Sequence, residues 1–208
     1  FGLKHGFADI KNGEHFKSRV PIQSYDDLKP YVDRMMKGEQ NLLWPTEIKW
    51  FAKSSGTTSN RSKFIPVSKE ALEECHYKGG KDMLSIYCSH REDSAVFTGR
   101  TLMMGGSSQT IDPDNNTYHG DLSSIIIKNL PFWAEIRRTP DRETALMDDF
   151  EAKLEKMADI CAKENVTSIS GVPSWNLILL NKILEKNQKT DIKEIWPNLE
   201  VFFHGGVA

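Results

Sequence analysis

The sequence has few cysteines and no long apolar run. Its 208 residues include three well-separated cysteines, which form no Cys-x-x-Cys pair and cannot all be joined in disulfides within one chain. Free thiols are typical of a reducing compartment, so we expect a cytoplasmic protein. No apolar run approaches the roughly 20 residues that cross a bilayer. We therefore expect neither a disulfide scaffold nor a membrane partner.

An excess of one charge is also lacking. Lys and Arg together number 27 and Asp and Glu number 29, which gives a net charge of −2. Without a basic stripe the chain has no field that would attract nucleic acid, so any anion site has to be local. The six histidines show no metal-ligand spacing with Cys or acidic residues, and we expect no metal site made by the protein alone.

Three motifs of nucleotide and hydrolytic enzymes are missing. A P-loop that began at Gly56 would need a second glycine at position 61, where the chain has Arg61. The Gly-x-Gly-x-x-Gly fingerprint of dinucleotide-binding proteins is absent, as is the Gly-x-Ser-x-Gly nucleophile elbow. These absences argue against a P-loop kinase or ATPase, a nicotinamide enzyme and an α/β-hydrolase.

The most distinctive feature present is a hydroxyl-rich run, residues 53–63, between two apolar β-type segments. Residues 48–52 and 64–67 read as strands, so the run is predicted to be the loop of a hairpin. Its Ser and Thr hydroxyls and backbone N–H groups are suited to phosphate oxygens, and Gly56 allows close backbone approach. Lys63 could neutralise phosphate charge. A solvated loop without a ligand is the alternative that local composition leaves open.

Alternating strands and helices are predicted in the second half of the chain. Strands are expected at 101–104, 166–170 and 199–203, and helices at 140–164 and 173–186. This alternation is typical of an α/β fold with a largely parallel sheet flanked by helices. Earlier helices are expected at 26–37 and 68–86, whereas 122–133 is apolar and ambiguous between strand and helix.

Small-residue loops follow the three predicted strands of the second half. They are Gly105-Gly106-Ser107, Gly171-Val172-Pro173-Ser174 and His204-Gly205-Gly206. In open α/β sheets, ligands bind at the carboxyl ends of the strands. We therefore expect a ligand site at these loops, although glycine can also simply end a strand.

The hydroxyl-rich run carries a family resemblance. Ser55-Gly56-Thr57-Thr58-Ser59 with Lys63 resembles the phosphate signature of adenylate-forming enzymes such as acyl-CoA synthetases and firefly luciferase, Thr-Ser-Gly-Thr-Thr-Gly-x-Pro-Lys-Gly. The chain departs from that signature at Asn60, Ser62 and Phe64. It is more similar to the auxin-responsive family of acyl acid–amido synthetases, in particular its bacterial members. Further segments that resemble this family are Arg19-Val20-Pro21-Ile22, residues 25–31, Leu43-Trp44-Pro45, residues 171–175 and residues 204–207.

The resemblance implies an activity, a fold and a set of site residues. The family activates a carboxylic acid with ATP and Mg²⁺ as an acyl-adenylate, then transfers the acyl group to the amine of an amino acid. It implies that residues 1–208 are a fragment of the large N-terminal adenylation domain. The implied ATP phosphate contacts are Ser54, Ser55, Gly56, Thr57, Thr58, Ser59 and Lys63. The implied adenylate-side loop is His204, Gly205 and Gly206, and the implied acyl-substrate pocket is Gly105, Gly106, Ser107, Ser174 and Trp175.

The family's small C-terminal lid domain and its catalytic lysine are absent from this sequence, so we expect the fragment alone to be inactive. Two alternatives stay open. One is an acyl-CoA-forming synthetase, which the missing Gly-x-Pro-Lys-Gly pattern disfavours. The other is a catalytically inactive module of the same fold.

Overall fold

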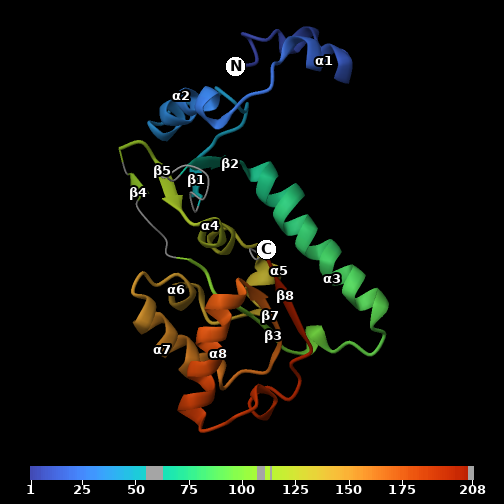
Figure 1. Cartoon of the computed structure of the whole chain (residues 1–208), viewed down its shortest axis with the longest axis vertical. Coiled ribbons are helices and arrows are strands. Elements are labelled where there is room, and N and C mark those ends of the chain that lie inside the picture. Colours follow the sequence, from blue (N-terminus) through green and yellow to red (C-terminus); the bar gives the residue numbers. More distant parts are fainter. Residues whose placement is uncertain (55–62, 107–110, 113, 206–208) are drawn as a thin grey trace. The chain divides into compact units, whose positions relative to one another are not determined.

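The computed structural model describes residues 1–54, 63–106, 111–112 and 114–205 (Figure 1). Two compact units divide the chain. The first comprises Phe1–Ala71 with Thr110–His119, and the second comprises Leu72–Gln109 with Gly120–Ala208. Within the described ranges, no helix has the length and apolar character needed to cross a membrane.

The first unit contains two α-helices and a small sheet. The helices are α1 (Gly13–Arg19) and α2 (Tyr25–Met36). In spatial order, the strands are β2 (Phe64–Val67), β1 (Trp50–Lys53), β5 (Thr117–Gly120) and β4 (Ile111–Asp112). Strands β1 and β2 pair antiparallel, with Lys53 opposite Phe64, so the predicted hairpin is confirmed.

Helix α2 forms as its sequence predicts. The Ser24 hydroxyl accepts the Asp27 N–H, and the Asp27 carboxylate accepts the Ser24 N–H, so each satisfies an N–H group that a helix start leaves unpaired. The apolar face of the helix buries Val32 and Met35 against Ile48 and Phe51. The helix is thereby fixed beside the hairpin.

The second unit is built on a parallel sheet. In spatial order, its strands are β6 (Arg138–Thr139), β3 (Arg100–Met103), β7 (Val166–Gly171) and β8 (Val201–His204). Each adjacent pair is parallel, which confirms the predicted fold class. Its helices are α3 (Lys78–His90), preceded by a π-helical stretch (Ala71–Tyr77), α4 (Leu122–Lys128), α5 (Phe132–Glu135), α6 (Arg142–Ala145), α7 (Phe150–Cys161) and α8 (Pro173–Asn187).

The two faces of the parallel sheet have different environments. Leu102 and Ile169 lie opposite each other in register and are buried with Met157 of α7 and Leu179 of α8. Figure 1 shows α7 and α8 together over this sheet. Because side chains alternate along a strand, Thr101 and Met103 of β3 face the other side.

The predicted long helix at 140–164 is wrong, because two helices occupy this range. The Asp141 carboxylate accepts the Thr144 N–H and caps α6, and the Asp149 carboxylate accepts the Ala152 N–H and caps α7. Two N-caps eight residues apart favour two short helices over a continuous one. The ambiguous segment 122–133 is also settled, since it forms α4 and the start of α5.

Candidate active site

The base of the predicted phosphate loop is closed by two hydrogen bonds between Ser54 and Lys63. The Ser54 N–H donates to the Lys63 carbonyl at 2.8 Å, and the Ser54 hydroxyl accepts the Lys63 N–H at 3.2 Å. The loop residues proper, Ser55, Gly56, Thr57, Thr58 and Ser59, lie outside the described residues. The structure therefore locates the two ends of the loop, and the phosphate contacts stay a prediction.

Tyr25 of α2 anchors the strand that leaves this loop. Its hydroxyl accepts the Phe64 N–H at 3.0 Å and donates to the Phe64 carbonyl at 3.2 Å. Strand β2 is at the edge of its sheet, so this one hydroxyl takes the place of a neighbouring strand at Phe64. The Lys63 ammonium lies 5.3 Å from the centre of the Tyr25 ring, a favourable cation–π distance. Tyr25 thus holds both the strand and the cation at the base of the loop.

We expect Tyr25→Phe to destabilise the protein by about 1 kcal/mol, since it leaves the Phe64 N–H and carbonyl without their partner while keeping the ring under Lys63. Chemical denaturation measures the difference. Tyr31→Phe is the matched control, because the Tyr31 hydroxyl makes no hydrogen bond among the described residues, although its ring contacts Phe1. Equal losses in the two variants would contradict the role of the Tyr25 hydroxyl.

The predicted ligand loops of the second unit gather at one edge of the parallel sheet. Gly171, at the end of β7, is the register partner of His204, at the end of β8, and Met103 is the partner of Ser170. Gly105 and Gly106 therefore follow β3 at the same edge that carries Gly171 and His204. Gly205 is described beside them, whereas Ser107 and Gly206 lie outside the described ranges. Contacts between these three loops and a ligand stay a prediction.

The turn after β3 packs closely against neighbouring side chains, most tightly at Gly106. A Cβ at Gly106 would lie 2.0 Å from the Asp121 carboxylate, and one at Gly105 would lie 2.9 Å from both Ile127 and Leu146. Such distances are well inside van der Waals contact. Gly106 therefore does more than end a strand, since it permits close packing against Asp121 at the start of α4.

The other two residues predicted for the acyl pocket, Ser174 and Trp175, lie in the first turn of α8. Both are exposed in this unit, and the Trp175 ring meets the Phe150 ring edge-on at 6.4 Å. The next residue, Asn176, is buried and donates to the Val172 carbonyl at the start of the helix.

An apolar cavity of about 200 Å³ lies on the second face of the parallel sheet. Strand residues Thr101, Met103, Ser170 and Phe203 form its floor. Its other lining residues come from the π-helical stretch, α3, α4, α5 and the α4–α5 connection; they are His76, Tyr77, Gly80, Met83, Leu84, Ile126, Leu130, Trp133 and Ala134. Sequence reasoning did not identify this cavity, and its lining includes none of the four predicted acyl-pocket residues that the structure describes, Gly105, Gly106, Ser174 and Trp175. The signal available in the sequence was the alternation at 101–103, which places two side chains on one face.

Polar groups in this cavity are few. The Tyr77 hydroxyl donates to the Ile126 carbonyl at 3.1 Å, which joins the π-helical stretch to α4. Burial, with a contribution from Glu73, raises the pKa of Tyr77 to about 12, so the hydroxyl stays protonated at neutral pH. The cavity is suited to a mainly apolar molecule of small size.

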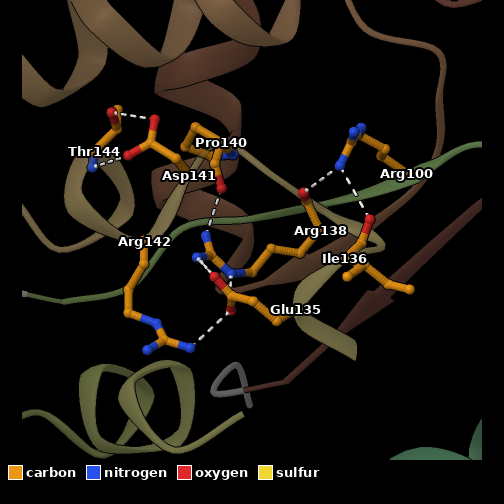
Figure 2. Close-up of polar contacts among 8 residues, drawn as sticks. All are labelled: Arg100, Glu135, Ile136, Arg138, Pro140, Asp141, Arg142 and Thr144. Atoms are coloured by element: carbon orange, nitrogen blue, oxygen red, sulfur yellow. Dashed lines mark hydrogen bonds and ion pairs between the residues drawn. The ribbon is translucent and has the colours of Figure 1, made fainter. Parts of the chain in front are cut away.

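The edge of the sheet at β6 is held by a buried ion pair. The Arg138 side chain is 1% exposed and forms a two-pronged contact with Glu135, at 2.6 and 2.9 Å, while also donating to the Pro140 carbonyl. Figure 2 shows the Arg138 guanidinium between these partners, with Arg142 approaching Glu135 from the other side at 3.3 Å. Because Glu135 belongs to α5, this pair fixes the helix that carries Trp133 and Ala134 into the cavity.

No cluster of three His, Cys, Asp or Glu side chains that could hold a metal ion occurs in the part of the chain that the structure describes. Magnesium that accompanies a nucleotide is usually held by one or two carboxylates together with phosphate oxygens and water.

Comparison with known proteins defines the family. The model of the GH3 family N-terminal domain matches residues 1–208, and the chain belongs to this family. An Arabidopsis thaliana relative, indole-3-acetic acid-amido synthetase GH3.15, is 36% identical over 207 residues, which covers 95% of this chain and 32% of the relative. Another from the same plant, 4-substituted benzoates-glutamate ligase GH3.12, is 41% identical over 123 residues, which covers 51% of this chain and 21% of the relative.

A solved structure shares the fold. The AtGH3.15 acyl acid amido synthetase in complex with 2,4-DB superposes with a TM-score of 0.71 and 16% sequence identity, covering 93% of this chain and 42% of that one.

A rice relative, putative indole-3-acetic acid-amido synthetase GH3.10, is 26% identical and covers 83% of this chain. The chain spans about a third of the length of these curated synthetases.

Proposed function

We propose that the full-length protein carrying this chain is an ATP-dependent ligase that activates a carboxylic acid as an acyl-adenylate and transfers it to the amine of an amino acid. The observation that carries the proposal is the apolar cavity on the parallel sheet of a GH3-family chain. The acids in the names of its relatives, indole-3-acetic acid and benzoates, are aromatic carboxylic acids, and such a cavity suits their rings.

The chemistry has two demands that this chain's residues can meet. Attack of a carboxylate on the α-phosphate brings two anions together, so the protein has to align the groups and offset their charge. We assign the phosphate end of ATP to the loop that starts at Ser54 and ends at Lys63, with Lys63 held by Tyr25. We assign the adenylate side to the loop at His204, Gly205 and Gly206. Mg²⁺ bound to the phosphates would neutralise part of their charge, with phosphate oxygens and water as its main ligands.

We assign the acid to the cavity. The Gly105-Gly106 turn and the first turn of α8, with Ser174 and Trp175, follow the carboxyl ends of strands β3 and β7. An acid whose ring lies on Thr101, Met103 and Phe203 rests on the strands that lead to these loops.

Narrowing the cavity tests this assignment. In the full-length protein we expect pyrophosphate exchange that depends on an added aromatic carboxylic acid. Extra methylene groups in a well-packed site cost about 1–3 kcal/mol, and the larger side chain of Ala134→Leu would take space from the bound acid. Ala134→Leu should therefore raise the KM for the acid by about 10-fold and leave the KM for ATP unchanged.

The matched control is Ala152→Leu, a similar change at an exposed position of α7. An unchanged acid KM in Ala134→Leu would remove the cavity from the proposal. Absence of acid-dependent exchange across a broad panel of acids would contradict the ligase itself. Product assays with amino acids and with coenzyme A then separate amide formation from thioester formation.

A further inference from the structure

One peptide group at the carboxyl end of β3 is held from both sides. The Lys153 ammonium donates to the Gly105 carbonyl at 3.0 Å, and the Gly106 N–H donates to the Ser123 hydroxyl at 2.9 Å. The carbonyl of Gly105 and the N–H of Gly106 belong to the same planar peptide unit. Rotation of this unit would break both hydrogen bonds, so its orientation is fixed.

Lys153 lies in an unusual place for a lysine. It belongs to α7, its exposed fraction is 3%, and the hydrogen bond to Gly105 is buried. Burial lowers the pKa of Lys153, while the nearby charges of Asp148 and Asp121 oppose this shift. Burying a charge is unfavourable, and apolar replacements of similar volume are often as stable or more stable. Packing alone therefore gives little reason for an ammonium at this position.

The held peptide is connected to the cavity through α4. Asp121 precedes this helix, and its carboxylate packs against Gly106. Ser123, which accepts the Gly106 N–H, is in the first turn, and Ile126, one turn later, lines the cavity. A change in the orientation of the Gly105-Gly106 peptide would thus displace both the turn and one wall of the cavity.

We propose that Lys153 is a positioning residue for the acid substrate, which sets the Gly105-Gly106 peptide and, together with Ser123, the start of α4 beside the cavity. This inference rests on the function proposed above. Lys153 acts through the peptide, with its ammonium occupied by the Gly105 carbonyl. Its loss is therefore expected to affect the acid and to spare the phosphate end of ATP, whose loop belongs to the other unit.

The test uses Lys153→Met and Lys153→Arg in the full-length protein. Methionine has a similar length without the charge. It removes a buried ammonium but also leaves the Gly105 carbonyl without its donor, so we expect only a small shift of the denaturation midpoint. We expect kcat/KM for the acid to fall by about 10- to 100-fold, the range for a lost hydrogen bond to a charged group, with the KM for ATP unchanged. Arginine can still donate to the carbonyl and should restore part of the activity.

Two further variants sharpen the result. Lys156→Met removes an exposed lysine of the same helix and should leave the kinetics unchanged. Ser123→Ala releases the other side of the peptide and should give the same selective defect in acid use. If Lys153→Met does not fold, Ser123→Ala decides, because normal acid kinetics in that variant overturn the proposal.

The two proposals fail in different ways. Wild-type protein without acid-dependent exchange overturns the proposed ligase and this inference with it. An active wild type and an equally active Lys153→Met overturn the role of Lys153 alone. A loss in Lys153→Met that affects acid and ATP equally and follows a loss of stability shows a merely structural lysine, which also overturns it.

Discussion

Replacing Ser55 and Thr57 together by alanine should weaken ATP binding by the full-length protein at least about 100-fold and leave its stability unchanged. Hydrogen bonds to charged groups contribute about 1.5–3 kcal/mol each, so losing two from a phosphate gives an effect of this size. Both residues belong to the hydroxyl-rich run between β1 and β2, whose base is closed by Ser54 and Lys63. Calorimetric titration with ATP measures the affinity, and chemical denaturation of the wild type and the double variant measures the stability.

Ser62→Ala is the matched control for the loop. Ser62 lies in the same run, yet it stands at a position where the sequence departs from the phosphate signature of adenylate-forming enzymes. We expect its affinity for ATP to equal that of the wild type. Unchanged affinity in the double variant would remove the phosphate assignment from this loop. Equal losses in both proteins would show a general disturbance of the hairpin.

Removing the carboxylate of Glu135 should destabilise the protein by roughly 3 kcal/mol, because Glu135→Ala leaves the Arg138 guanidinium buried without its counterion. Arg138 is 1% exposed, and the Pro140 carbonyl alone cannot offset its charge. Chemical denaturation measures the loss. Glu164→Ala provides the control, since the Glu164 pair with Arg100 is only partly buried and should contribute less than about 1 kcal/mol. Similar losses in the two variants would contradict the importance of burial.

The same pair predicts a dependence of stability on pH. Hydrogen bonds from Arg138 hold the pKa of Glu135 below its ordinary value of 4.5. A carboxylate whose pKa is lower in the folded state stabilises the fold fully above the unfolded-state value, and this contribution is lost as pH falls through the folded-state value. The difference in stability between wild type and Glu135→Ala should therefore be constant near neutral pH and shrink below about pH 4.5.

Several elements follow from local sequence. The two apolar β-type segments at 48–52 and 64–67 predicted the hairpin, and Ser24 with Asp27 predicted the start of α2. Strand β7 and helix α8 lie within one or two residues of their predicted limits. The single helix predicted at 140–164 is wrong, because the second N-cap at Asp149 divides this range into two helices.

One part of the candidate site could be predicted from the sequence and another part could not. The three strand-end loops could be named from the sequence because glycine clusters follow apolar runs, and parallel pairing then places them at one edge of the sheet. The cavity could not be named, because its wall combines α3, α4 and α5 with alternate residues of three strands. No local pattern says which face of a parallel sheet is packed solid and which keeps a space.

The sequence by itself determined the α/β class, the hairpin with its hydroxyl-rich loop and the resemblance to acyl acid–amido synthetases, because periodicity and motif spacing are local properties of the chain. Only the tertiary structure decided that Tyr25 anchors Phe64, that Lys153 holds Gly105 and that an apolar cavity lies on the sheet. The residues of these two pairs are 39 and 48 positions apart. Contacts over such separations depend on how helices pack against strands, and a pattern read along the chain does not contain that information.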